Sequence, residues 1–278
     1  MLDPHSLPTF AACAAALAAL CGCAAADADA AEKPLAIASY NIRSFRGMDG
    51  ERDIDRTIAA LKKIPFDICG LQEVRKTDED ETAPIEQAAA KLGMKAYFAQ
   101  TLARPGFIYG IGLLSRYPFE VVEQLTLPIP PEHEPRTAII AKIDHPDGVF
   151  YFINTHLSAN RDDAGRREQL AMILETVRTK NYTPAILVGD LNSKPESETI
   201  KLLNEEWEVF GDETSTYPAR KPRLRIDYIA GYPKGAFRAL RYRVVRDAAS
   251  SDHRPLVAEL QRATPAPPAG AASSAGSK

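Results

Sequence analysis

The sequence predicts an α/β fold: a four-layer α/β sandwich in which two packed mixed β-sheets are flanked by helices. Short apolar segments of strand length alternate with segments of helical spacing from residue 35 to residue 260. Some strand segments, such as residues 185–188, are apolar at every position, which is typical of strands buried on both faces. Two sheets packed face to face, with helices outside, bury such a set of elements.

The first half of the chain alternates between the two kinds of element. Residues 35–42 form an apolar run that predicts a strand, and Ile54, Ile58 and Leu61 recur at the spacing of a helix over 54–64. A second strand is expected at 67–74 and a helix at 85–92. A middle region rich in strands follows, with strands expected at 96–100, 108–115, 120–127, 137–144 and 149–156.

The second half continues the alternation without a break that resembles a linker. It predicts a helix over 164–178 and a strand over 185–190, and then shorter strands at 225–230, 236–245 and 256–260. We therefore expect residues 34–261 to form one domain.

The two ends of the chain differ from this domain in composition. An apolar run at 10–22 ends in Leu20-Cys21-Gly22-Cys23, which resembles a lipobox, so residues 1–22 are expected to be a signal peptide of the lipoprotein type. Residues 23–33 would then be a tether that begins with an acylated Cys23, and residues 262–278 a disordered tail rich in Pro, Ala and Ser. The alternatives are a plain cleaved signal peptide or an alanine-rich helix. We expect an exported protein, either lipid-anchored in a bacterial cell envelope or periplasmic.

Composition argues against some classes of protein. The formal net charge is −3, so the basic surface that drives nonspecific binding to nucleic acid is missing. No segment has the 18 or more consecutive apolar residues of a permanent membrane-spanning helix. The four cysteines offer neither a disulfide framework nor a zinc site, and Cys69 in its apolar run is expected to be buried.

Polar side chains gather where the predicted strands end or begin. They are carboxylates, amides and imidazoles: Asn41, Glu73, Asn154, His156, Asp190, Asn192, Asp227, Asp252 and His253. Burying so many ionisable groups costs several kcal/mol each unless they are paired or bind a cation. Because hard oxygen ligands dominate the set, it favours Mg²⁺, or Mn²⁺, over zinc.

Six short motifs resemble the signature blocks of one family, in the same order. They are Tyr40-Asn41-Ile42, Leu71-Gln72-Glu73-Val74, Asn154-Thr155-His156-Leu157, Gly189-Asp190-Leu191-Asn192, Ile226-Asp227-Tyr228-Ile229 and Ser251-Asp252-His253. Together they resemble the endonuclease/exonuclease/phosphatase (DNase I-like) superfamily, which includes pancreatic-type deoxyribonuclease, neutral sphingomyelinases and inositol polyphosphate 5-phosphatases. The segment 109–115 and the loop 217–223 are most similar to the sphingomyelinase-like branch, which includes the C-terminal domain of the Calcofluor-white-hypersensitivity protein.

The resemblance implies a role for each matching residue. Glu73, Asn41 and Asp252 would form the metal site. Asp190 would activate water, Asn192 would donate to a phosphoryl oxygen, and Asp227 would hold His253 in its protonated form. His156 and Arg136 would neutralise charge on the phosphate. Arg136 and Asn154 would be the phosphate-binding residues.

One departure from the family pattern concerns His156. The deoxyribonucleases pair the matching histidine with a glutamate on a neighbouring strand, and residues 109–115 contain no counterpart. This favours a phosphate ligand over a general acid at His156.

The resemblance as a whole implies a Mg²⁺-dependent phosphoesterase that hydrolyses a phosphodiester by in-line attack of an activated water. A lipid or envelope phosphodiester is the favoured substrate. The alternatives are a DNase-like nuclease, for which nucleic acid would be the partner, and an inactive binding protein on the same fold. We expect a monomer, and we expect the loops 43–52, 101–109 and 158–165 to select the substrate.

Overall fold

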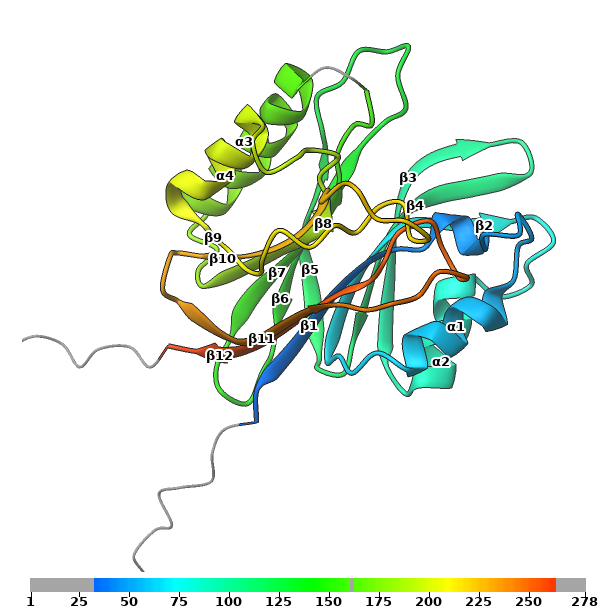
Figure 1. Cartoon of the computed structure of the whole chain (residues 1–278), viewed down its shortest axis with the longest axis horizontal. Coiled ribbons are helices and arrows are strands. Elements are labelled where there is room, and N and C mark those ends of the chain that lie inside the picture. The colour runs from blue at the N-terminus through cyan, green and yellow to red at the C-terminus, as the bar shows by residue number, and fades with distance from the viewer. Residues whose placement is uncertain (1–32, 161–162, 264–278) are drawn as a thin grey trace, which may run out of the picture. The chain divides into compact units, whose positions relative to one another are not determined.

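Two mixed sheets of six strands each form the centre of the part of the chain that the structure, a computed structural model, describes: residues 33–160 and 163–263 (Figure 1). The first sheet has the strand order β11-β12-β1-β2-β4-β3, and the second has the order β5-β6-β7-β8-β10-β9. The strands are β1 (Leu35–Asn41), β2 (Ile68–Thr77), β3 (Lys95–Arg104), β4 (Phe107–Ser115), β5 (Phe119–Thr126), β6 (Thr137–Ile143), β7 (Phe150–His156), β8 (Ala185–Asp190), β9 (Glu208–Val209), β10 (Asp227–Tyr232), β11 (Phe237–Val244) and β12 (Leu256–Arg262).

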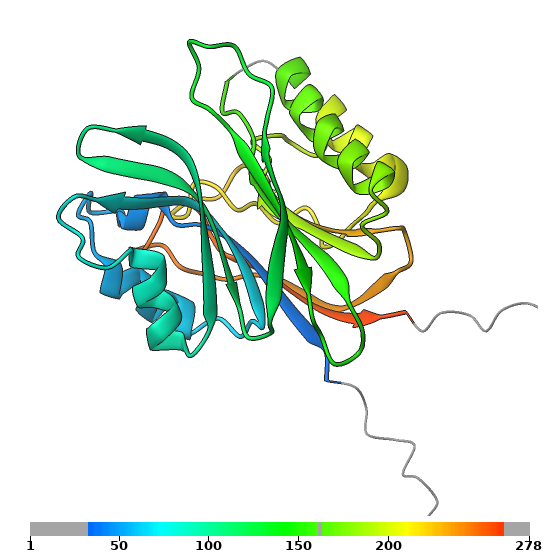
Figure 2. The same ribbon diagram turned by 180° about the vertical axis from the view of Figure 1, so that it is seen from behind.

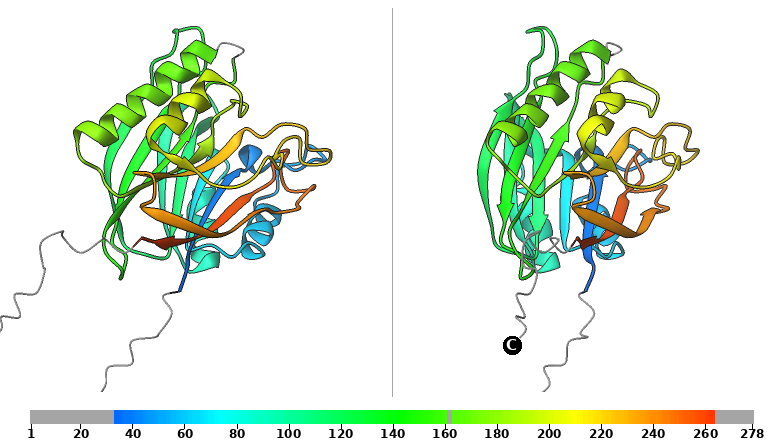
Figure 3. Two further views of the ribbon diagram at one scale, coloured as in Figure 1. Left: turned by 60° about the vertical axis from the view of Figure 1, so that its left-hand side comes forward. Right: turned by 90° about the vertical axis from the view of Figure 1, so that its left-hand side faces the viewer.

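Helices cover the outer face of each sheet. Helices α1 (Ile54–Lys62) and α2 (Pro84–Leu92) pack on the first sheet, and α3 (Asp163–Thr179) and α4 (Glu198–Glu206) pack on the second. A short 3₁₀ helix, η1 (Arg43–Phe45), follows β1. The side views in Figure 3 show the sheets between the two helical layers. The expected four-layer α/β sandwich is therefore confirmed.

The alternation of side chains along each strand divides the apolar residues among three cores. In β1, Ile37 packs between the sheets, whereas Ala38 and Tyr40 point to the layer of α1 and α2. The third core lies between the second sheet and α3 and α4, and it includes Leu170 and Leu203. Because every central strand is covered on both faces, the strands carry the continuous apolar runs seen in the sequence.

The connectivity brings the predicted site residues to one edge of the sandwich. Strands β1 and β2 are parallel neighbours in the first sheet, and β7 and β8 are parallel neighbours in the second. The parallel strands of each pair run toward the same edge. Asn41 is therefore paired with Gln72, next to Glu73, and His156 is paired with Asp190. Each sheet thus supplies half of the site.

Four details differ from the expectations. Helix α4 was not predicted, and neither was the short strand β9. Residues 101–109 are not a loop, because β3 and β4 run into a tight turn at Pro105-Gly106, where Gly106 takes a φ of +88°. Strand β12 continues to Arg262, one residue beyond the expected end of the domain.

The predicted terminal segments are not part of the described structure. The signal peptide (1–22), nearly all of the tether (23–33) and the tail beyond residue 263 lie outside the described residues. Within the described ranges, no helix is long and apolar enough to cross a membrane.

Candidate active site

Asp190 lies at the centre of the site. It is the last residue of β8 and is only 1% exposed. Its Oδ2 accepts a hydrogen bond from Asn41 Nδ2 at 3.0 Å, and its Oδ1 accepts one from the backbone N–H of Asn192 at 3.0 Å. Two imidazole nitrogens are also close to Oδ2, His156 Nε2 at 3.5 Å and His253 Nε2 at 3.6 Å. One carboxylate therefore links both sheets.

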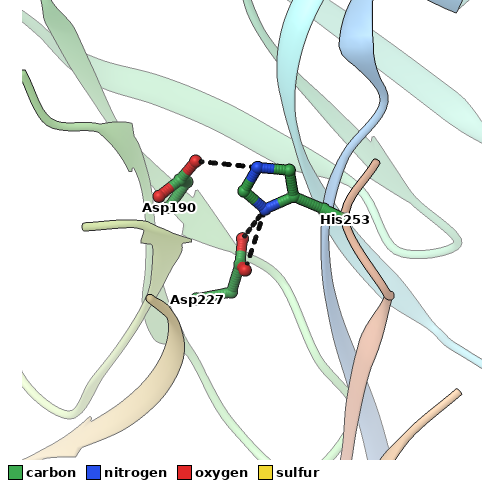
Figure 4. A group of neighbouring side chains, drawn as sticks. All are labelled: Asp190, Asp227 and His253. Atoms are coloured by element: carbon green, nitrogen blue, oxygen red, sulfur yellow. Dashed lines mark hydrogen bonds and ion pairs between the residues drawn. The ribbon is translucent and has the colours of Figure 1, made fainter. Parts of the chain in front are cut away.

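His253 is held by a second carboxylate on its other side. Its Nδ1 lies 3.0 Å from Asp227 Oδ2 and 3.2 Å from Asp227 Oδ1, so the ring stands between Asp227 and Asp190 (Figure 4). The Thr216 hydroxyl donates a hydrogen bond to Asp227, and the Tyr217 ring lies 4.8 Å from the His253 ring, centroid to centroid. These contacts fix the orientation and tautomer of the imidazole.

The two carboxylates determine the charge of His253. Burial alone would lower the pKa of His253, but the negative charges of Asp227 and Asp190 outweigh this effect and raise it to about 10. His253 is therefore a cation at neutral pH. For Asp190, burial and the nearby charge of Asp227 both disfavour the carboxylate, and they raise the pKa of its carboxyl group to about 7. A carboxylate with a pKa close to neutrality is suited to take a proton from water.

His156 differs from the expected charged phosphate ligand. It is 5% exposed, and burial, with the charges of Arg136 and His253, keeps its pKa well below the usual value. The amide Nδ2 of Asn192 lies 3.1 Å from His156 Nε2 and can only donate, so this ring nitrogen accepts. His156 is therefore neutral and cannot neutralise charge. Its Nδ1 is buried without a hydrogen-bond partner in the described structure, which agrees with the missing glutamate.

Glu73 is presented to the site by an irregularity in β2. The pairing of β2 with β4 shifts register between Leu71 and Val74, and Glu73 has a φ of +59°. Such a conformation costs about 1–3 kcal/mol for a residue other than glycine and is typical of functional positions. Burial raises the pKa of Glu73, and the charge of Asp252 adds to the rise.

Asn41 supports the carboxylates with its amide nitrogen, which differs from the expected metal ligand. Its Nδ2 donates to both Glu73 Oε1 and Asp190 Oδ2, each at 3.0 Å, while its Oδ1 accepts from the backbone N–H of Arg43. Because its amide nitrogen faces the carboxylates, Asn41 orients these two groups. It does not present its amide oxygen to a metal ion. The backbone carbonyl of Asn41 also accepts a hydrogen bond from Ser251 Oγ, which ties β1 to the loop of Asp252.

Two places in the site could hold a divalent cation. Glu73 and Asp252 supply hard carboxylate oxygens, and a cation between them would relieve the repulsion that raises the pKa of Glu73. Asp190, Asp227 and His253 also bring one potential ligand atom each within 4.8 Å of one another. Both ring nitrogens of His253 already face these carboxylates, however, Nδ1 toward Asp227 and Nε2 toward Asp190. The residues therefore fit a cation at Glu73 and Asp252 better.

The two predicted phosphate-binding residues have different positions. Arg136 is 6% exposed, pairs with Glu134 and lines the same cleft as His156 and His253. Asn154 does not reach the cleft. It is fully buried, and its amide donates to the carbonyls of Leu71 and Gly112 and accepts from Gln72 Nε2 at 2.7 Å. The expected phosphate contact of Asn154 is corrected to a bridge between the two sheets.

A cleft of about 800 Å³ opens over these residues. Glu73, Arg136, His156, Asp190, Asn192, Asp252 and His253 all line it. Sequence reasoning gave no individual role to three residues that contact this set. Arg43 Nε lies 3.5 Å from Asp252 Oδ2, the Thr216 hydroxyl donates to Asp227, and the Tyr217 ring lies beside His253. Arg43 stands two residues after the Asn41 motif, but an isolated arginine or threonine in a loop carries no pattern of its own.

Comparisons with known proteins agree with this geometry. The family model of the Endonuclease/Exonuclease/phosphatase family matches residues 38–253. No curated protein sequence matches significantly. Similar solved structures include the endonuclease/exonuclease/phosphatase from Beutenbergia cavernae DSM 12333, which is 23% identical with a TM-score of 0.71 over 83% of this chain and 72% of that one.

Two further structures share the fold over the length of their chains. The mannosyl-6-phosphatase Bt3783 of Bacteroides thetaiotaomicron VPI-5482 is 20% identical, with a TM-score of 0.64 over 82% of this chain and 99% of that one. The human Nocturnin catalytic domain with bound sulfate anion is 18% identical, with a TM-score of 0.64 over 83% and 94%. At these identities the likeness shows the fold alone. The family match spans most of the described domain, and the chain therefore belongs to the endonuclease/exonuclease/phosphatase family, whose members are phosphoesterase hydrolases.

Proposed function

We propose that this protein is a Mg²⁺-dependent phosphoesterase that hydrolyses a phosphodiester by in-line attack of an activated water. The observation that carries the proposal is the arrangement of Asp190 between Asn41, Asn192 and the two histidines, with Asp227 behind His253. It places a buried base next to a charged donor, in a cleft large enough for a substrate.

Each side chain has a part in the proposed chemistry. Asp190, with its raised pKa, orients the attacking water and takes its proton. Protonated His253 and the amide of Asn192 donate hydrogen bonds to phosphoryl oxygens whose negative charge grows in the transition state. Asp227 accepts the hydrogen bond of His253 Nδ1 and holds the ring in this orientation. Arg136 adds a second fixed positive charge at the wall of the cleft.

Enzymes of this family typically use divalent metals, and the carboxylates present here fit one. Glu73 and Asp252 would hold the ion, with Asn41 orienting Glu73. When bound, Mg²⁺ would stabilise negative charge on the phosphoryl and leaving oxygens.

A lipid or envelope phosphodiester is the proposed substrate. The net charge of −3 gives no general attraction for nucleic acid, and the lipobox-like segment would keep the protein at a membrane. A DNase-like nuclease is the alternative within the same chemistry. The mannosyl-6-phosphatase on this fold shows that phosphomonoesters also belong in any test of the substrate.

A panel assay tests the proposal. The purified protein is given bis-p-nitrophenyl phosphate, p-nitrophenyl phosphate, sphingomyelin, phosphoinositides and plasmid DNA, each with and without Mg²⁺. We expect Mg²⁺-dependent cleavage of the diester, and of a lipid in preference to DNA. Cleavage of the monoester alone would contradict the diester assignment, and cleavage of DNA alone would favour the nuclease. If no compound is hydrolysed at all, the enzymatic proposal is wrong.

A further inference from the structure

A hairpin of the first sheet forms one wall of the cleft. Beyond the register shifts at residues 71–74 and 100–102, β2, β3 and β4 continue together to the turn at Pro105-Gly106. We call this extension, residues 74–77, 102–104 and 107–110, the flap. Figures 1 and 2 show that the β3–β4 hairpin projects beyond the neighbouring strands of the sheet.

The pleat of the flap sets five side chains on the face toward the cleft. Arg75 is paired with Tyr109 across β2 and β4, and Tyr109 with Leu102 across β4 and β3. Phe107 lies two residues from Tyr109 on the same face and is paired with Arg104. All five line the cleft that contains Glu73 and Asp190. The wall is therefore apolar and aromatic, with two guanidinium groups set into it.

These two arginines have no acidic partner. Neither Arg75 nor Arg104 forms an ion pair with any residue of the described ranges, whereas Arg43, Arg52 and Arg136 each do. Arg104 is exposed, and its Nη1 reaches only the backbone carbonyl of Ala103, at 3.5 Å. The flap thus presents two guanidinium groups that have no carboxylate within ion-pair distance among the described residues, although Glu73, Glu132, Glu134 and Asp252 line other parts of the same cleft.

Arg75 is also held in position. Its guanidinium carbon lies 3.8 Å from the centroid of the Phe107 ring, in the geometry of a cation–π contact. Its backbone carbonyl accepts a weak hydrogen bond from Arg52, and its Nε is buried without a hydrogen-bond partner among the described residues. A guanidinium that is fixed in place, unpaired and open to a cleft loses little freedom when it binds an anion.

We infer that the cleft face of the flap binds a second anionic group of the substrate, a phosphate or phosphonate-like oxyanion next to the phosphoester that is cleaved. Arg75 and Arg104 bind the anion, and Phe107 positions Arg75. Guanidinium groups bind such oxyanions through paired, charge-assisted hydrogen bonds, which neutral parts of a substrate cannot form. The inference rests on the proposed function and narrows its substrate to phosphoesters that carry a further negative charge on one side.

Two matched ligands test this subsite without turnover. Propylphosphonate has one oxyanion, and propane-1,3-bisphosphonate has a second one at the other end of the same three-carbon chain. Their dissociation constants are measured by isothermal titration calorimetry on the full chain in excess Mg²⁺. We expect the wild type to bind the bisphosphonate about tenfold or more tightly than the monophosphonate, the scale of one charge-assisted interaction.

Variants then assign the preference to the flap. The ratio of the two dissociation constants should fall at least about fivefold in Arg75→Met and in Arg104→Met, because these variants keep an apolar stem but lose the charge. Arg238→Met on the distant strand β11 is the matched control and should leave both affinities unchanged. Since Arg104 is exposed at the tip of the flap, its variant remains a valid test if Arg75→Met fails to fold. Equal affinities in the wild type, or a full preference in both flap variants, would overturn the inference.

Hydrolysis of bis-p-nitrophenyl phosphate, measured on the same samples, separates this inference from the proposed function. Turnover without a preference for the bisphosphonate refutes the subsite and leaves the enzymatic proposal intact. A preference lost in the flap variants, without turnover of any compound, supports the subsite and refutes the hydrolase.

Discussion

At the scale of single residues, the site combines groups that would repel or destabilise one another if each were placed alone. Asp190 and Asp227 are both 1% exposed, and the His253 ring stands between them as a cation. A buried charge that loses its partner costs several kcal/mol, so the three groups depend on one another. The charge of Asp227 contributes both to the raised pKa of Asp190 and to the raised pKa of His253.

The first prediction concerns Asp190→Asn. This nearly isosteric change removes the base, so kcat should fall by about two to four orders of magnitude while KM changes little. Burial and the charge of Asp227 destabilise the Asp190 carboxylate, and His253 keeps Asp227 as its partner in this variant, so the melting temperature should stay the same or rise by a few degrees.

Steady-state kinetics and thermal unfolding measure these two effects. Asp78→Asn, at an exposed position directly after β2, is the control and should change neither quantity. Near-wild-type turnover in a folded Asp190→Asn protein would mean that another group activates the water.

The sequence identified residues that the structure brings together at one cleft, but it also assigned Asn154 to this set and did not identify Thr216. Asn154 and His156 are two positions apart on β7, so both point between the sheets. His156 is at the end of the strand and reaches the cleft, but Asn154 lies one repeat deeper and is covered by Gln72 and Gly112. Depth along a strand depends on the neighbouring sheet, which no local motif describes. The neutral state of His156 likewise depends on Arg136 and His253, which are distant in sequence.

At the scale of elements, Asp163 joins the two outer helices of the second sheet. It lies in the first turn of α3, and its Oδ2 accepts hydrogen bonds from the backbone N–H groups of Glu198 and Thr199 at the start of α4. Its Oδ1 accepts a hydrogen bond from the Thr199 hydroxyl at 2.8 Å. One side chain therefore caps a helix that is 35 residues away in the chain.

The second prediction is that Asp163→Ala destabilises the fold by about 1 kcal/mol, the usual cost of losing a helix cap, and lowers Tm by about 2–4 °C. Burial alone would raise the pKa of Asp163, but its hydrogen bonds with Thr199 and the charge of Arg166 lower it. A folded-state pKa below the unfolded value gives a contribution that is fully present above the unfolded pKa of about 3.9. It is lost as the pH falls through the folded-state pKa.

Urea unfolding from pH 7 to pH 3 checks this sign. The difference between the wild type and Asp163→Asn, which keeps an acceptor oxygen but not the charge, should be constant near neutrality and shrink in acid. A difference that grows as the pH falls would contradict the assignment.

The order of strands and helices could be predicted to within a few residues, because apolar periodicity is local. Helix α4 was missed even though Ser197 caps it and Ile200, Leu203 and Trp207 follow at helical spacing. The helix is short, at nine residues, four of which are charged, and much of its stability comes from packing on the second sheet and from Asp163. Residues 101–109, at the tip of the flap, were expected as a loop, since only the pairing of β3 with β4, and of β4 with β2, makes residues 102–104 and 107–109 strands.

At the scale of the whole molecule, one cation should link the site to global stability. Glu73 on the first sheet and Asp252 before β12 come from distant parts of the chain, so an ion bound by both favours the folded state.

The third prediction is that saturating Mg²⁺ or Mn²⁺ raises the Tm of the wild type by about 5 °C or more and that EDTA reverses the shift and abolishes hydrolysis. Differential scanning fluorimetry gives a readout that does not depend on activity. Glu73→Gln should lose the shift, while the exposed control Glu120→Gln should keep it. An equal shift in Glu73→Gln would place the ion elsewhere, with Asp190, Asp227 and His253 as the first candidates.

The last prediction is that an acyl chain on Cys23 holds the domain at a membrane. The apolar run at 10–22 ends in Leu20-Cys21-Gly22-Cys23, and only eleven residues separate Cys23 from Leu35, where β1 begins. An acyl chain on Cys23 would therefore keep the domain close to the bilayer surface, at the position where a lipid or envelope diester is available.

We predict that the protein, expressed in a bacterium with its own leader, partitions with membranes and into detergent, with lipid on Cys23 detected by mass spectrometry. Cys23→Ser should become soluble or stay unprocessed, whereas Cys13→Ser, within the segment that is removed, should behave as the wild type. A wild-type protein found only in the soluble periplasm with an unmodified mature N-terminus would contradict the anchor, and the proposed lipid substrate would then lose its main support.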